Sequence, residues 1–237
     1  MEIGVLGATG PAGAGLAARL ASLGYDVVAG SRDLARASAT VGELVERWGD
    51  RVARLRPATN RDAAHARDLV IVATTWEAAV DTTAAHAADL EGKVVIAMAN
   101  GLAKVDREFR AVLPEEGSVA AAMQAAAPEA RVVAAFQHIP AAAFARLDEP
   151  LESDVIVCSD DDDARHLVLG LVAAIPNLRA FDGGSLANSL GVEAFGAVLL
   201  TLNLKHRGKG TLRLLGLEGY IPTGASSGGA SSPSTSS

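Results

Sequence analysis

The residues best suited to do chemistry are three glycines near the start of the chain, Gly7, Gly10 and Gly13. They follow the short apolar run 3–6 and lead into a helical pattern of leucines. Glycines permit positive φ and close backbone approach, and the free amides of a helix start bind a pyrophosphate. The spacing differs from the commoner Gly-x-Gly-x-x-Gly and would also suit a plain strand-to-helix turn. We expect phosphate contacts from the turn residues Thr9, Gly10, Pro11 and Ala12.

The end of the second expected strand, 25–29, carries Ser31, Arg32 and, one turn later, Arg36. An acidic residue at this place would hold the ribose diol of NAD. A hydroxyl and two guanidinium groups instead suit the 2′-phosphate of NADP. Asp33 could also reach a ribose, but it precedes the next helix and is expected to cap it. Arg36 fits an ordinary surface role equally well, so Ser31 and Arg32 carry the preference for NADP.

Composition and charge restrict the function classes. The chain has 237 residues, of which 49% are hydrophobic and 21% charged, enough for a substantial core. Its net charge of −7 argues against nucleic acid or an anionic membrane surface as a partner. No apolar run reaches the roughly 18 residues that span a bilayer, and no secretory signal is evident. We expect a cytoplasmic protein whose one cysteine, Cys158, is buried in a strand.

The wider pattern alternates strands and helices, with apolar strands at 68–73 and 93–97 around a helix at 76–90. This predicts an α/β fold with a doubly wound parallel (Rossmann) sheet. At the switch point of such a sheet, strand ends line the nicotinamide crevice. By position alone, the candidates are Thr74, Thr75, Met98, Ala99 and Asn100.

The remaining chain predicts a smaller C-terminal α/β domain that contains a long apolar helix at 185–206. We expect a nucleotide-binding domain at 1–136 and a coenzyme-binding and dimerisation domain at 137–222. The Ser/Gly-rich tail, 223–237, cannot form a core and is expected to be disordered. An apolar helix this long suggests a homodimer.

Several blocks together resemble the NADPH-dependent reductases of the deazaflavin coenzyme F420, over nearly the whole chain before the tail. Their order and spacing carry the resemblance, and three of them lie outside the generic nucleotide-binding half. The blocks are GATGPAG (7–13), GSR (30–32), TWE (75–77), IPAA (139–142), FARLDE (144–149), VCSDDDD (157–163) and DGGSLANS (182–189).

This resemblance implies reversible hydride transfer between NADP(H) and coenzyme F420, with both rings stacked in one cleft. It also implies that the loop 137–141 holds the deazaflavin through the amides of Ile139 and Ala141, with Leu212 as an apolar contact. His138 could protonate the reduced ring, but a binding role is favoured, because the family's histidine can stand one position earlier, where this chain has Gln137.

Two other readings remain open from the residues. An NADP-dependent imine or hydroxy-acid reductase of the same fold would carry a lysine on the long helix, where none precedes Lys205. A non-catalytic NADP sensor would bind the dinucleotide without an acceptor.

No metal is expected. The other histidines, predicted to be surface residues, lack the spacing of metal ligands, and the acidic run 160–163 suits helix capping. Those histidines are His65, His86, His166 and His206.

Overall fold

The structure is a computed structural model that describes residues 1–222. Six strands form one sheet in which every neighbouring pair is parallel. Their order is β3-β2-β1-β4-β5-β8, the doubly wound arrangement predicted from the sequence. The strands are β1 (Glu2–Leu6), β2 (Asp26–Ser31), β3 (Leu55–Thr59), β4 (Leu69–Val72), β5 (Val94–Ala97) and β8 (Arg131–Ala134).

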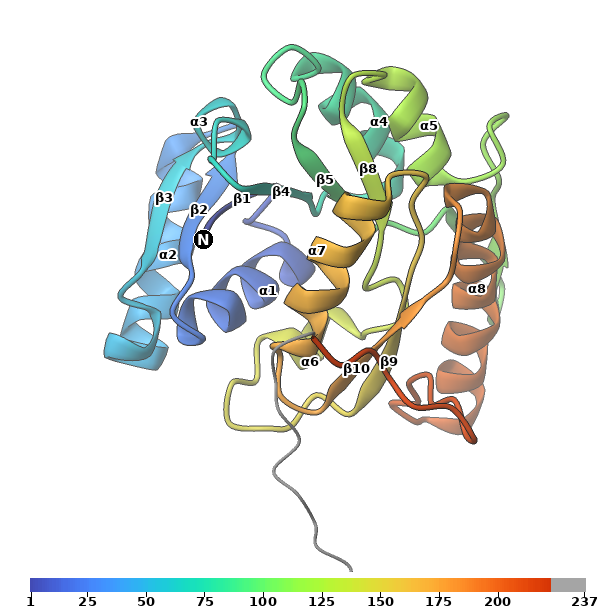
Figure 1. Cartoon of the computed structure of the whole chain (residues 1–237). Helices are drawn as coiled ribbons and strands as arrows, with labels where there is room; N and C mark the ends of the chain where they lie inside the picture. The colour runs from blue at the N-terminus through green and yellow to red at the C-terminus, as the bar shows by residue number, and fades with distance from the viewer. Residues whose placement is uncertain (223–237) are drawn as a thin grey trace, which may run out of the picture.

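Helices cover both faces of this sheet (Figure 1). One apolar core packs α1, α2 and α7 on one face, and a second packs α3, α4 and α5 on the other. Both faces of each central strand are therefore buried, which is why these strands are continuous apolar runs. The helices are α1 (Pro11–Ser22), α2 (Leu34–Trp48), α3 (Asn60–Ala64), α4 (Trp76–Ala85), α5 (Val119–Ala126), α6 (Ala141–Phe144) and α7 (Asp162–Ala173).

A second, smaller sheet follows the large one. Its two parallel strands, β9 (Ser153–Val157) and β10 (Leu178–Asp182), are joined by α7. The paired residues Ala134 and Cys158 connect the end of β8 to this part of the chain. Cys158 is buried, as expected, and burial raises the pKa of its thiol to about 11.

The long helix α8 (Ser189–His206) stands at the far edge of the molecule (Figure 1). A short hairpin of β6 (Leu102–Val105) and β7 (Glu108–Ala111) packs along it. The stretch Leu186–His206 is long and apolar enough to cross a membrane by length and composition, and one third of its most apolar window is buried. Its environment in the folded chain, described below, is that of a packed helix with one exposed side.

Several boundaries differ from the predicted ones. The helix expected to reach residue 90 ends at Ala85, and the expected helix at 185–206 begins with a separate 3-10 turn, Leu186–Asn188. Strand β3 was not predicted; it contains Pro57 and lies at the edge of the sheet, where proline is tolerated. The prediction of disorder for 223–237 lies outside the described residues.

Candidate functional site

The turn between β1 and α1 needs glycine at two of its three positions. Gly7 has φ +81°, and a Cβ there would lie 2.7 Å from the Thr74 side chain. A Cβ on Gly13 would lie 2.6 Å from the carbonyl oxygen of Gly7. Gly10 meets no such obstacle. The turn is thus folded tightly on itself and against the end of β4.

Free amides lie at the start of α1. Gly10 is the N-cap residue and supplies no side-chain acceptor, and Pro11 occupies the first helical position, where no amide hydrogen is required. The amides of Ala12 and Gly13, in the first turn, have no acceptor within the helix. With the positive end of the helix dipole, they form a site suited to a phosphate.

At the end of β2, the side chain of Asp33 is already engaged. Its Oδ1 accepts a hydrogen bond from the Ala35 amide at 2.8 Å, which confirms the predicted cap of α2. Ser31 is 3% exposed, and its Oγ accepts from the Asp33 amide at 3.3 Å, so its hydroxyl hydrogen remains free to donate. Arg32 and Arg36 are exposed beside it.

These features meet in one cavity of about 460 Å³ at the carboxyl edge of the sheet. Ten of the residues expected from the sequence to contact the coenzymes line it, namely Thr9, Gly10, Pro11, Ala12, Ser31, Arg32, Arg36, Thr74, Thr75 and Ala141. The cavity therefore runs from the arginines after β2 to the first residue of α6. Its lining joins the expected dinucleotide site to the expected deazaflavin loop.

Asn60 lines the same cavity and was missed in the sequence. It is 7% exposed, and its Oδ1 accepts a hydrogen bond from the Gly7 amide at 3.2 Å, so it supports the glycine turn from the end of β3. A local signal was present, because Thr59 and Asp62 form a capping box that marks a helix start at this point.

The end of β5 differs from the expectation. Met98 and Ala99 are each only 9% exposed and, like Asn100, do not line this cavity. Asn100 turns toward the next loop, where its Nδ2 donates to the Gln137 carbonyl at 2.8 Å. The switch-point rule places these three residues near the cavity, but their side chains serve packing and a loop contact in this structure.

The loop between β8 and α6 offers one free amide rather than two. The Ile139 amide donates to the Phe136 carbonyl at 3.2 Å, so it is occupied within the loop's own turn. Ala141 is the first residue of α6, where an amide has no acceptor within the helix, and it borders the cavity. The expected pair of amides is thus reduced to that of Ala141 in this conformation.

His138 belongs to this loop, and its side chain is buried beneath it, with the residue 6% exposed. Its Nε2 lies 2.7 Å from the Val192 carbonyl on α8, and its ring meets the edge of Phe195 at 5.5 Å between centroids. Burial lowers the pKa of His138. Because a carbonyl only accepts, Nε2 carries the hydrogen of the neutral ring. The side chain thus anchors the loop to α8.

Leu212 lies apart from the first cavity. It is half-buried, and its carbonyl accepts from the Asp154 amide at 2.9 Å, which fixes the segment after α8 along β9. The adjacent Thr211 lines a second cavity of about 630 Å³ together with Pro140 and Lys209. Leu212 therefore lines neither cavity, although its neighbour Thr211 lines the second one, which also reaches Pro140 in the loop.

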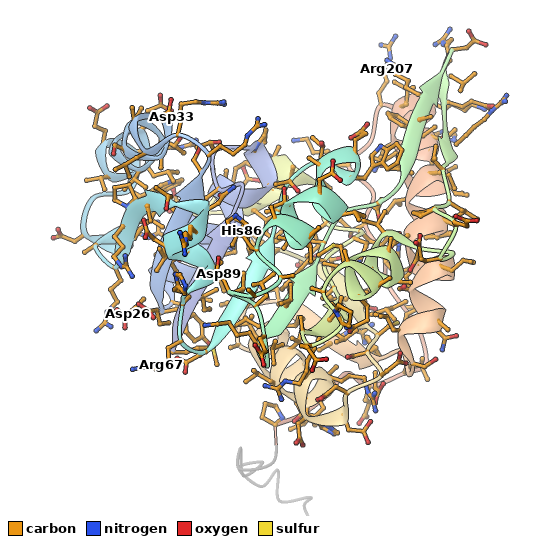
Figure 2. All side chains as sticks on the ribbon, turned by 90° about the horizontal axis from the view of Figure 1, so that it is seen from above. Asp26, Asp33, Arg67, His86, Asp89 and Arg207 are labelled. Atoms are coloured by element: carbon orange, nitrogen blue, oxygen red, sulfur yellow. The ribbon has the colours of Figure 1, made fainter. Side chains whose placement is uncertain are left out.

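Of the four histidines predicted to be surface residues, His65, His166 and His206 are exposed, as predicted, and His86 is half-buried. His65 Nε2 and His86 Nδ1 lie 3.0 and 3.3 Å from the two oxygens of Asp89, and Figure 2 shows His86 and Asp89 side by side. The hydrogen bond from His86 lowers the pKa of Asp89. In the acidic run, the Asp161 side chain accepts from the Ala164 amide at 2.7 Å and caps α7, as predicted. Among the described residues, no cluster of three metal-ligating side chains occurs.

Known proteins resemble this chain in sequence and in fold. Residues 2–101 match the family model described as NADP oxidoreductase, coenzyme F420-dependent. The chain is 35% identical to an F420-dependent NADP reductase of Methanocaldococcus jannaschii, over 92% of this chain and 100% of that protein. Among solved structures, a candidate F420-dependent NADP-reductase from Arthrobacter sp. FB24 superposes with a TM-score of 0.77 at 26% identity, covering 90% of this chain and 99% of that chain.

An imine reductase from Bacillus cereus shares the fold alone. It superposes with a TM-score of 0.58 at 16% identity, over 87% of this chain and 62% of that chain. Identity of 35% over a relative's full length is a far closer relation. The chain belongs to the family of F420-dependent NADP reductases.

Proposed function

We propose that this protein transfers a hydride reversibly between NADP(H) and coenzyme F420. The observation that carries the proposal is the single cavity that joins the glycine turn and Arg32 at one end to the start of α6 at the other. One dinucleotide can extend along the first part, and its nicotinamide then reaches the part beside Ala141. The coenzymes supply the redox chemistry, and the protein holds their rings in contact.

At the dinucleotide end, the amides of Ala12 and Gly13 would bind the pyrophosphate. Ser31 would donate its free hydroxyl hydrogen to the 2′-phosphate, and Arg32 and Arg36 would supply charge-assisted hydrogen bonds. The cap formed by Asp33 supports NADP over NAD, because that carboxylate is already turned to the start of α2. Asn60 would keep the turn in its binding conformation through Gly7.

At the deazaflavin end, the free amide of Ala141 would donate to the ring edge where negative charge accumulates on reduction. Ile139 would contribute its side chain and the turn that its amide closes. His138 would act through the loop that it anchors, because its hydrogen-bearing Nε2 faces Val192. Leu212 would contact the coenzyme only from the neighbouring surface.

The other readings find less support. Asn188 and Asn203, the polar residues that an imine reductase of this fold could use, donate to the carbonyls of Gly183 and Gly210. The chain also matches F420-dependent relatives over its second half, beyond the dinucleotide-binding part. That extent argues against a sensor which binds NADP alone.

The test follows the transferred atom. NADPH carrying deuterium at C4 is mixed with oxidised F420, and the reduced coenzyme is examined by NMR. Direct transfer predicts deuterium at C5 of the deazaflavin for one of the two C4 labels and retention in NADP for the other. Solvent hydrogen at C5, with either label, would contradict direct transfer.

We further propose that residues 1–136 bind the dinucleotide and that 137–222 bind the second coenzyme and form a homodimer. Support for the dimer comes from one side of α8, where four apolar side chains are exposed, Leu190, Phe195, Val198 and Leu202. A second copy of the chain would cover them. A cytoplasmic location fits the use of NADPH as electron carrier.

A further inference from the structure

The loop between β8 and α6, residues 135–140, is held in a strained conformation. Phe136 has φ +73°, a region that residues with a Cβ rarely adopt. Its ring is buried and meets Phe144 edge to face, with 5.9 Å between centroids. Strain of this kind persists only where surrounding contacts determine the conformation, and it gathers at functional sites.

Two side-chain amides tie this loop to the end of β5. Gln137 Nε2 donates to the Ala97 carbonyl at 2.9 Å, and Asn100 Nδ2 donates to the Gln137 carbonyl at 2.8 Å. The two bonds run in opposite directions between the same two strand ends, one from the loop to β5 and one from beyond β5 to the loop. Together they fix the separation of these segments.

Neither amide is fully satisfied. Asn100 Oδ1 and Gln137 Oε1 are buried and have no donor among residues 1–222. An unpaired buried acceptor lowers the free energy of unfolding by at least as much as one hydrogen bond raises it. These two amides therefore contribute little to the stability of the fold. Gly196 on α8 closes the other side of Asn100, because a Cβ there would lie 3.0 Å from Nδ2. Asn100 is thus confined to the contact with the loop.

We propose that Asn100 and Gln137 are positioning residues that set the spacing between the nicotinamide and the deazaflavin. The inference rests on the proposed function. The end of β4 lines the cavity through Thr74 and Thr75, β5 is paired with β4 in the sheet, and the loop leads directly into Ala141, at the deazaflavin end of the same cavity. A clamp between the two segments therefore fixes one ring relative to the other.

The reacting atoms make this spacing decisive. The C4–H bond of the dihydronicotinamide breaks, and its hydrogen moves with both electrons to C5 of the deazaflavin. A proton from solvent completes the reduced ring. Reacting atoms must approach to about 3 to 3.5 Å, and a displacement of about 1 Å costs roughly 100-fold in rate.

The test uses two isosteric variants of the full-length protein, Asn100→Asp and Gln137→Glu, in which a carboxylate replaces the donor amide. Gln124→Glu is the matched control. Gln124 also donates its amide to backbone carbonyls, including that of Ala130 at 2.8 Å, but it lies on α5 and contacts the amino end of β8, away from the loop. Asn100→Ala removes the donor without adding charge, and it serves if the aspartate variant does not fold.

The measurements are the single-turnover hydride-transfer rate with both coenzymes saturating, its primary deuterium isotope effect at several temperatures, and the dissociation constant of NADPH. We expect the rate to fall by about 10- to 100-fold and the isotope effect to become more temperature-dependent, with less than about a threefold change in NADPH binding. Gln124→Glu should change only thermal stability.

Two results would overturn the clamp. One is an unchanged transfer rate in variants that lose as much thermal stability as Gln124→Glu, which would make the amides structural. The other is weaker NADPH binding with an unchanged rate at saturation, which would make them binding residues. Failure of the proposed function is recognised separately, because the wild-type protein would then show no hydride transfer at all.

Discussion

The buried carboxyl of Glu193 gives a quantitative prediction about stability. Its two oxygens accept hydrogen bonds from the amides of Val119 and Ala120, at 2.7 and 3.0 Å, and so cap α5 from α8. The residue is 2% exposed, and burial raises the pKa of its side chain to about 7, against the lowering effect of the two amides. The folded protein therefore holds this proton more tightly than the unfolded chain does.

The direction and size of the pH effect on stability follow from the linkage between protonation and folding. A raised pKa stabilises the fold fully below the ordinary value of 4.5, and this contribution is lost as the pH rises through about 7. Each unit of pKa difference corresponds to about 1.4 kcal/mol, so the contribution of Glu193 to the free energy of unfolding falls by about 3 kcal/mol across this window. A glutamine at the same position does not titrate.

The assay compares wild type with Glu193→Gln by urea unfolding at steps from about pH 5 to pH 8. Subtracting the variant removes the titration of other groups, such as Asp154, whose pKa its ion pair with Arg179 helps to lower. The difference in unfolding free energy should shift by about 2 to 3 kcal/mol in favour of the variant as the pH rises. Glu43→Gln, on the exposed face of α2, is the control. A difference that stays constant with pH would refute the raised pKa.

Three further predictions concern the coenzyme sites and the surface of α8. Arg32→Ala should weaken NADPH binding by about 10- to 100-fold, the loss of one charge-assisted hydrogen bond, while NADH binding stays nearly unchanged; equal effects on both would contradict the 2′-phosphate assignment. Ala141→Pro should weaken F420 binding but not NADPH binding, because proline is tolerated at the first helical position yet has no amide hydrogen; unaltered F420 affinity by calorimetry would exclude that amide. Val198→Glu should halve the mass measured by light scattering, and a wild-type protein that is already monomeric, or that binds lipid vesicles instead, would contradict the proposed dimer.

The sequence predicted best what local geometry determines. The glycine turn, Pro11 at the start of α1 and Asp33 at the start of α2 all depend on residues within a few positions of one another. Ten predicted residues consequently line one cavity. The parallel sheet followed from the alternation of apolar strands and helices, which a doubly wound fold requires.

What the sequence could not supply was the direction of side chains and the pairing of backbone amides. The strand end at Met98 and Ala99 was expected to line the crevice, but packing turns both side chains inward. The amide of Ile139 closes a turn that depends on the positive φ of Phe136. No residue type in this stretch of sequence indicates that positive φ. Asn60 accepts a hydrogen bond from the Gly7 amide, 53 residues earlier in the chain. It directly follows β3, the strand that contains Pro57.

The most direct test of the central claim is the absorbance of oxidised F420 when the purified protein is mixed with it and NADPH, with NADH as the control. The account predicts rapid bleaching of the deazaflavin band that requires NADPH and reverses when NADP is added to the reduced coenzyme. Binding of NADPH without bleaching would contradict the proposed reaction at its second substrate.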